Sequence, residues 1–203
     1  MKTLLITLSL LVSASGAEPS CCPAKTAACC AKALPAAKSS ELSLYQADST
    51  WTTDQGKNVK LTALQGRPQI VTMFFSTCVS ACPLLVNDMK RIEETLPANV
   101  RTNVGFALVS FDSELDTPAK LAKYRAQHKL PANWTLLHGE PDDVLELAAL
   151  LGVKFKKEST GGFSHSNIIT LLNPSGEIVT QQVGLNLDPA PLAEAAVKTL
   201  TKP

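Results

Sequence analysis

The sequence predicts one globular domain of the α/β class, with a central mixed sheet flanked by helices. Segments with helical periodicity alternate with short apolar runs, in the order strand, helix, strand, helix, strand, helix, hairpin, helix. The run at 69–75 is apolar almost without interruption, which indicates a strand buried on both faces. The 203 residues suffice for one domain of ordinary size plus an N-terminal extension.

The first 17 residues have the composition of a secretory signal peptide. A lysine precedes an apolar run over 4–12, and the small residues that follow favour cleavage after Ala17, with Ala14 as the alternative. The apolar run is too short to span a bilayer unless the signal is left uncut. We therefore expect an exported protein, periplasmic or secreted, without a transmembrane anchor after cleavage.

Residues 18–40 are rich in Ala, Lys, Pro and Ser, so we expect a flexible tail ahead of a folded domain at 41–203. Four of the six cysteines lie in this tail as two adjacent pairs, Cys21, Cys22, Cys29 and Cys30. Geometry disfavours a bond within an adjacent pair. Disulfides between the two pairs, disulfides with another molecule, and a second soft-metal site all stay open.

The first elements of the domain follow from turn and breaker residues. Strand-like residues 44–53 and 59–61 flank the turn signal Asp-Gln-Gly-Lys, which predicts an N-terminal hairpin. After the buried strand at 69–75, apolar residues at helical spacing predict a helix that begins near Pro83 and ends before Pro97.

Capping and turn residues bound the remaining elements. We expect a strand at 104–111, a helix at 117–128, a strand at 134–137, a helix at 140–151, a polar segment at 154–162, a strand at 165–172, its hairpin partner at 177–183, and a helix at 188–200.

Two cysteines, Cys78 and Cys82, stand where the buried strand leads into the first helix. Their spacing predicts both on the first helical turn, with the sulfurs facing the same point. Free backbone N–H groups and the helix dipole stabilise a thiolate there, and a thiolate is both a nucleophile and a metal ligand. A plain structural disulfide is the alternative, which this reactive setting disfavours.

The three histidines differ in their settings. His128 and His138 lie beside charged and turn residues and are expected to be ordinary solvent-side residues. His165 follows a Gly-Gly loop at the start of an apolar strand, where a loop end can deliver a side chain to a site. Alone it would be read as structural, but with two thiolates it makes a soft ligand set suited to copper or zinc.

The chain resembles the Sco/SenC family from about residue 49 to 200. The family pattern of a strand that ends in aromatics before Thr-x-Cys-x-x-x-Cys-Pro matches residues 74–83. The family's stretch of valine, serine and aspartate matches residues 109–112, and its Asp-Thr-Pro helix start matches residues 116–118. Its metal-binding histidine and later Pro-x-Gly turn match His165 and 174–176.

This resemblance implies a thioredoxin-like fold and copper delivery to cytochrome c oxidase. It also implies that Cys78, Cys82 and His165 are copper ligands, with an oxidase subunit as acceptor and a thiol reductant protein as second partner. Relatives commonly have Pro-Asp between the cysteines and an aspartate before the histidine, where this chain has Val-Ser-Ala at 79–81 and Ser164. The missing carboxylates favour Cu(I) over Cu(II).

Other functions fit the residues less well. A thiol-disulfide oxidoreductase would use the same pair with Cys78 attacking. However, the three-residue spacer differs from Cys-x-x-Cys, and no proline lies in 163–172, where redox thioredoxins carry one. A thiol peroxidase needs Thr or Ser three residues before its cysteine, where this chain has Phe75 or Val79. Nearly balanced charge (19 basic, 18 acidic residues) argues against nucleic-acid binding.

Overall fold

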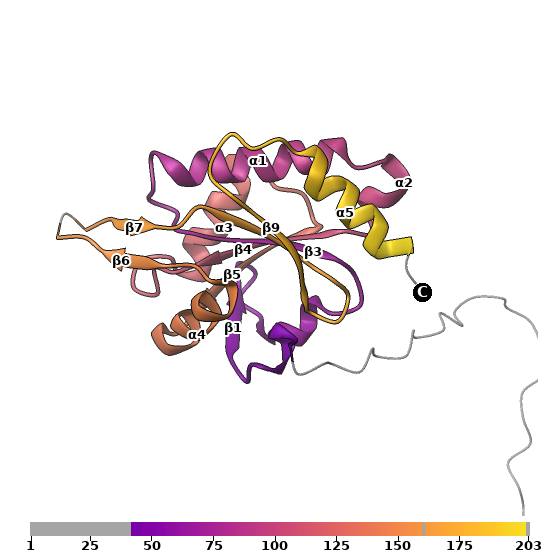
Figure 1. Cartoon of the computed structure of the whole chain (residues 1–203). Coiled ribbons are helices and arrows are strands. Elements are labelled where there is room, and N and C mark those ends of the chain that lie inside the picture. The colour runs from indigo at the N-terminus through magenta and orange to yellow at the C-terminus, as the bar shows by residue number, and fades with distance from the viewer. Residues whose placement is uncertain (1–41, 160, 202–203) are drawn as a thin grey trace, which may run out of the picture. The chain divides into compact units, whose positions relative to one another are not determined.

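Seven strands form the central sheet, in the order β2-β1-β5-β4-β3-β8-β9 (Figure 1). β3, β4 and β5 run parallel and the other neighbours pair antiparallel, so the sheet is mixed. The structure is a computed structural model that describes residues 42–159 and 161–201. The strands of this sheet are β1 (Thr50–Thr53), β2 (Asn58–Lys60), β3 (Gln69–Phe74), β4 (Gly105–Ser110), β5 (Trp134–Gly139), β8 (Ile168–Leu172) and β9 (Ile178–Val183).

A separate two-stranded sheet is a hairpin of β6 (Phe155–Lys157) and β7 (Phe163–His165). The sequence indicated only a polar segment at 154–162 and did not predict the strand β6. Two consecutive lysines in β6 hide the alternation that marks a strand, while Phe155 stacks on Phe111 with ring centroids 5.2 Å apart.

Helices cover the sheet on both sides. In Figure 1, α1 lies above the sheet with α5 beside it, and α4 lies below. α3 begins where the side chain of Thr117 accepts the N–H of Lys120, and α4 ends at Gly152, whose φ of 69° suits glycine. The helices are α1 (Ala81–Thr95), α2 (Ala98–Arg101), α3 (Pro118–His128), α4 (Pro141–Leu151) and α5 (Ala190–Thr201), with 3-10 turns at Leu44–Gln46 and Leu61–Leu64.

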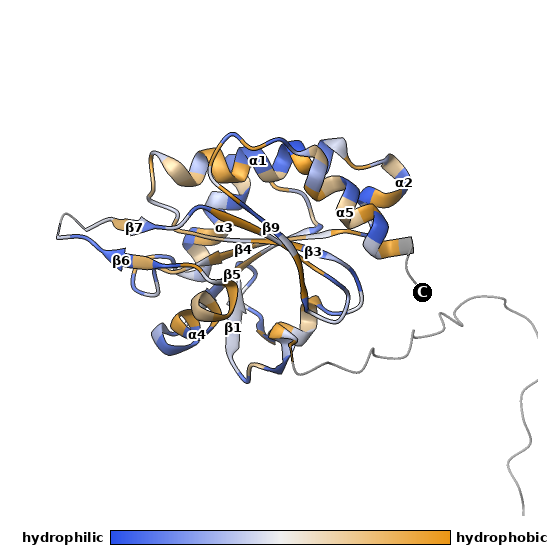
Figure 2. Ribbon diagram, viewed as in Figure 1, coloured by the Kyte–Doolittle hydropathy of each residue, from blue (hydrophilic) through white to orange (hydrophobic). Residues whose placement is uncertain are grey.

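The core lies against β3 and β4, in which every side chain is buried. Figure 2 shows apolar residues along these central strands, with hydrophilic residues on the outer sides of the helices. Because β3 and β4 are parallel, their carboxyl ends meet at one edge of the sheet. In open α/β sheets, ligand sites form outside that edge.

The predicted fold class is confirmed, including the terminal hairpins and the final helix. The predicted first strand is too long, since it begins at Thr50 rather than at 44. The hydroxyl of Ser43 accepts the N–H of Tyr45 and starts a 3-10 turn instead. The Tyr45 ring packs on Gly176, which has a φ of 86° and no room for a Cβ atom.

The expected signal peptide (1–17) and tail (18–40), with the cysteine pairs Cys21, Cys22, Cys29 and Cys30, lie outside the described residues. The proposed boundaries of these segments therefore stay predictions. Within residues 42–159 and 161–201, every helix is too short or too polar to cross a bilayer.

Candidate metal centre

The loop between β3 and α1 places the two cysteines. The N–H of Cys78 donates to the carbonyl oxygen of Phe75 (3.2 Å), which turns the chain at the end of β3. Cys82 lies in the first turn of α1, but Cys78 precedes the helix, so the prediction of both on that turn is wrong for Cys78. The Sγ atom of Cys78 accepts a hydrogen bond from the N–H of Cys82 (3.3 Å), which is one of the N–H groups that the helix itself leaves without a partner.

The fully buried carboxylate of Asp116 holds this loop in place. It accepts the N–H of Ser76 (2.7 Å) and the Ser76 hydroxyl, and the hydroxyl of Ser110 at the end of β4 also donates to it (2.6 Å). Lys120 of α3 lies 3.4 Å away. The loop is therefore joined to β4 by charge-assisted hydrogen bonds. Sequence reasoning treated Asp116 only as part of a helix start, because the local sequence does not reveal its burial.

His165 reaches the cysteines from the β6–β7 hairpin. Its Nδ1 lies 3.1 Å from the carbonyl oxygen of Ser166, so Nδ1–H can donate there. That tautomer leaves the lone pair of Nε2 facing Cys82 Sγ, 3.6 Å away. A hydrogen bond from the other ring nitrogen is the usual way in which proteins orient a metal-binding imidazole.

Three phenylalanines enclose the imidazole of His165. Phe111 lies 5.0 Å and Phe75 6.0 Å from it between ring centroids, and Phe163 packs on both phenylalanines at 5.1 and 5.2 Å. These rings come from the ends of β3 and β4 and from β7. They restrict the imidazole orientation and shield the inner side of the site from water. The sequence motifs at 74–83 and 109–112 contain Phe75 and Phe111, but they did not predict that these rings pack around His165.

The two thiols differ in acidity. Burial alone would raise the pKa of Cys78, but hydrogen bonds from Cys82 and Ser80 outweigh it and lower the pKa below the usual value. Burial raises the pKa of Cys82 well above its ordinary range, and the charges of Cys78 and Asp116 raise it further. Cys78 is therefore the readier thiolate, and it is also the more exposed of the two.

The three predicted ligands converge on one point. The two sulfurs and the imidazole nitrogen all lie within 4.8 Å of one another. Ligands about 2.2 Å from a shared ion in a trigonal plane lie about 3.8 Å apart, so the set needs to close by no more than about 1 Å. An open hollow of about 510 Å³ lies beside the cysteine loop, with Val79 95% exposed at its rim. Two sulfurs and one nitrogen suit a soft metal ion, and the hollow leaves one side accessible.

The other histidines lie apart from this cluster. His128 stacks on Tyr124 with ring centroids 4.0 Å apart at the end of α3, and His138 lies in β5 opposite Thr52. Neither belongs to a group of potential ligands in the part of the chain that the structure describes.

Comparisons with known proteins agree with this fold. The SCO1/SenC family model matches residues 37–201. The SCO1 protein homolog of Bacillus subtilis (strain 168) is 29% identical over 146 residues, which are 69% of this chain and 74% of the relative.

Two solved structures show the same thioredoxin-like fold. Copper-bound ScoI of Arabidopsis thaliana has a TM-score of 0.64 and 24% identity, over 75% of this chain and 95% of its own. BsSco, a Sco family member with a disulfide switch, has a TM-score of 0.63 and 23% identity, over 75% and 91%. Because the family model covers most of the sequence, this chain belongs to the SCO1/SenC family.

Proposed function

We propose that this protein is an exported copper-binding metallochaperone that delivers copper to an acceptor such as the copper site of cytochrome c oxidase. The observation that carries this proposal is the convergence of Cys78, Cys82 and His165 in one soft ligand set beside an open hollow. Relatives support it: ScoI of Arabidopsis thaliana was solved with copper bound, and BsSco belongs to a family of cytochrome c oxidase assembly proteins.

Copper uptake would begin at the half-exposed, more acidic thiol of Cys78 and finish at Cys82 and His165. The thiol of Cys82, whose pKa is raised, gives up its proton only as copper binds. Metal binding therefore releases protons, and affinity rises with pH. Delivery is the reverse ligand exchange, in which the acceptor approaches through the hollow at Val79 and takes over the ligand positions one at a time.

Cu(I) is the favoured oxidation state, although Cu(II) can also bind such a set. The donors are two soft thiolates and one imidazole. The buried carboxylate of Asp116, whose charge acts on Cys82, is already engaged by Ser76, Ser110 and Lys120. Ser164 takes the place next to His165 where relatives commonly have an aspartate, and the carboxylate that lines the hollow, Glu158, is solvent-exposed.

The remaining parts of the proposal concern residues outside the structure. Export through a signal peptide at 1–17 would place the protein in the periplasm or outside the cell. A thiol reductant protein must then keep Cys78 and Cys82 reduced, because that environment forms disulfides. The pairs at 21–22 and 29–30 would form a second soft-metal site that collects copper. Deleting residues 18–40 should then lower the bound copper from above one equivalent to one.

Copper titration of the reduced chain tests the main proposal. We expect one tightly bound copper in the domain, with sulfur-to-copper spectroscopic features, and large losses of affinity in Cys78→Ser, Cys82→Ser and His165→Ala. His128→Gln is the matched control, because it removes an imidazole outside the cluster. Failure to take up copper, or full affinity in His165→Ala, would refute the proposal.

Thiol-disulfide exchange with a partner protein is the second candidate function. The unequal acidity of Cys78 and Cys82 resembles that of an attacking and a resolving thiol. The metal function is favoured because an imidazole nitrogen faces Cys82 at 3.6 Å, a contact that disulfide exchange does not need. Reduction of a cognate disulfide by the metal-free protein, with no copper uptake, would reverse this order.

A further inference from the structure

The β6–β7 hairpin has two faces of different character. In the antiparallel register, Phe155 pairs with His165 and Lys156 pairs with Ser164. Because side chains alternate along a strand, Phe155 and His165 face inward to the site, whereas Lys156 and Ser164 face outward. Lys154 belongs to the outer face as well, because it lies two residues before Lys156 and lines a hollow with Lys156, Ser164 and Ser166. We call this outer face, with Lys154, Lys156, Ser164 and Ser166, the basic face.

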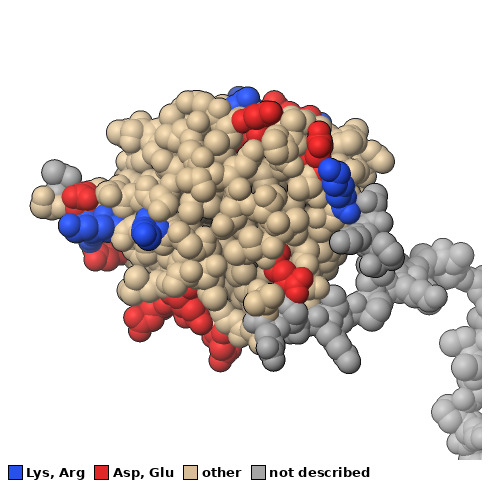
Figure 3. Space-filling model, viewed as in Figure 1, with Lys and Arg blue, Asp and Glu red and all other residues tan. Residues whose placement is uncertain are grey.

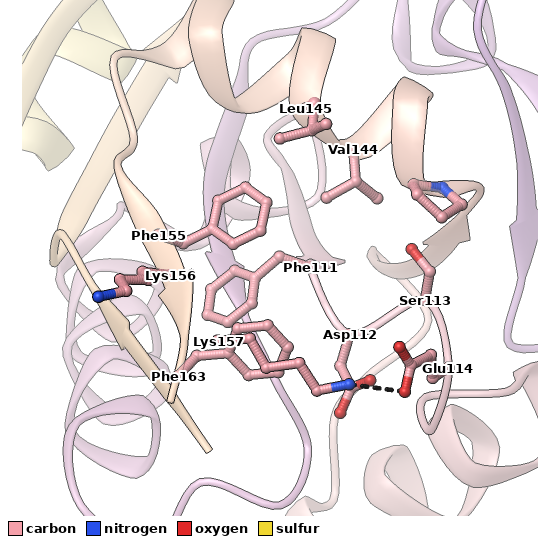
Figure 4. A pocket seen from close by; sticks show the side chains of 11 residues that line it. Phe111, Asp112, Ser113, Glu114, Val144, Leu145, Phe155, Lys156, Lys157 and Phe163 are labelled. Atoms are coloured by element: carbon pink, nitrogen blue, oxygen red, sulfur yellow. Dashed lines mark hydrogen bonds and ion pairs between the residues drawn. The ribbon is translucent and has the colours of Figure 1, made fainter. Parts of the chain in front are cut away.

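The two lysines of the basic face carry uncompensated charge. Both are exposed, and neither forms an ion pair within residues 42–159 and 161–201. Lys157, the third lysine nearby, is engaged by Glu114 at 2.6 Å. Figure 4 shows this ion pair beside an apolar groove, and it shows Lys156 pointing away from that groove.

The basic charge is local. The whole chain has a formal net charge of only +1, so the protein as a whole does not attract anions. Figure 3 shows basic side chains at the β6–β7 hairpin with acidic ones directly beside them, and a larger acidic group below, over α4. On the hairpin itself, Lys154, Lys156 and Lys157 outnumber one acidic residue, Glu158. An approaching acidic molecule would therefore meet a favourable field at the hairpin and an unfavourable one at α4.

The basic face also adjoins the metal ligands. Ser164 and Ser166 are the chain neighbours of His165, and Lys156 lies across the strand pair from Ser164, about 5 Å away between Cα atoms. A shallow hollow joins these residues to His165. A partner held by Lys154 and Lys156 would thus sit within about one Debye length of the metal centre.

We propose that the basic face is the docking surface for an acidic segment of the copper acceptor. This inference rests on the proposed copper-delivery function and adds the chemistry of the partner. Carboxylates of the acceptor would contact Lys154 and Lys156, which orients the acceptor over His165 and the hollow beside Cys78.

The transfer that follows is a ligand exchange without a change of oxidation state. Two acceptor thiols lose their protons and bind Cu(I), the bonds from copper to Cys78, Cys82 and His165 break, and the two released thiolates take up two protons. The basic face takes no part in these bonds. It raises the rate at which productive encounters form.

The test uses the reduced full chain loaded with one Cu(I) and two synthetic acceptor peptides. Both peptides carry a pair of cysteines, followed in one by a run of glutamates and in the other by glutamines. The variant is Lys154→Glu with Lys156→Glu. The matched control is Lys57→Glu with Lys198→Glu, which makes the same charge change in the β1–β2 turn and on α5, away from the hairpin.

In the wild-type protein we expect faster transfer to the glutamate peptide than to the glutamine peptide, by about three- to tenfold at low salt. Salt of about 0.5 M should abolish the difference. The hairpin variant should lose the preference and the control should keep it, with copper affinity unchanged in both. Equal rates for the two peptides, or an equal loss in the control, would overturn the docking proposal while copper delivery stands.

The same experiment distinguishes failure of the docking proposal from failure of the proposed copper delivery. A chain that takes up no copper gives no transfer rates to compare. An anionic membrane is the other acidic surface that the basic face could meet. Salt-sensitive binding of the wild-type chain to phosphatidylglycerol vesicles, lost in the hairpin variant while the peptide preference is absent, would overturn the proposal in favour of a membrane.

Discussion

Replacing Asp116 by alanine should destabilise the metal-free protein by about 3–5 kcal/mol. Its carboxylate is fully buried and accepts two hydrogen bonds from Ser76 and one from Ser110. Each hydrogen bond to a charged group contributes about 1.5–3 kcal/mol, so three such bonds together contribute about 4.5–9 kcal/mol. Water that enters the space left by the side chain offsets part of this sum, which gives the lower total.

Urea denaturation of the reduced protein measures this loss, and hydrogen exchange at the N–H of Ser76 reports whether the cysteine loop opens. Lys120→Met is the matched control, because it removes the ion pair and leaves the three hydrogen bonds of Asp116 intact. Lys120 is partly exposed, so the control should cost no more than about 1 kcal/mol. A cost below about 1 kcal/mol in Asp116→Ala, or equal costs in both variants, would refute the role given to the hydrogen bonds.

Further predictions concern the thiols. In the native reduced protein at neutral pH, iodoacetamide should modify Cys78 well before Cys82, because the pKa of Cys78 is lowered and that of Cys82 is raised. Peptide mass spectrometry measures the order of modification, and modification of Cys82 first would contradict the prediction. Copper affinity should rise with pH, by up to about two decades per pH unit while both thiols are protonated in the metal-free protein, and a pH-independent affinity from competition titrations would be inconsistent with thiolate ligation. The Ser80 hydroxyl lies 3.9 Å from Cys78 Sγ, so Ser80→Asp places a carboxylate near that sulfur. The added negative charge should strengthen Cu(II) binding more than Cu(I) binding. Parallel titrations with both ions measure this, and an unchanged Cu(II) affinity would disprove it.

The local sequence predicted those parts of the fold that depend on local patterns. The buried strand β3 was visible as an unbroken apolar run, and the start of α3 as Thr117-Pro118. The position of Cys78 outside α1 was not visible, because the bond from its N–H to Phe75 depends on how the loop packs.

Long-range contacts account for the other differences. Asp116 is a site residue only because folding brings the end of β4 next to the loop after β3, 40 residues away in sequence from Ser76. The strand β6 forms because Phe155 packs on Phe111, although its own sequence is polar. Cys78, Cys82 and His165 were predicted as a set from residue chemistry and family resemblance, and the structure brings them together.

His165 is attached to a hairpin whose strands are not hydrogen-bonded into the central sheet, whereas both cysteines are attached to the main body. A bound copper ion would therefore link the β6–β7 hairpin to the main body of the domain. Copper would fix the hairpin in the loaded state, whereas in the empty state its aromatic contacts and the ion pair of Lys157 with Glu114 hold it. The same hairpin carries the basic face. An acceptor that docks there would therefore meet a more rigid hairpin when copper is bound than when the site is empty, before any ligand exchange begins.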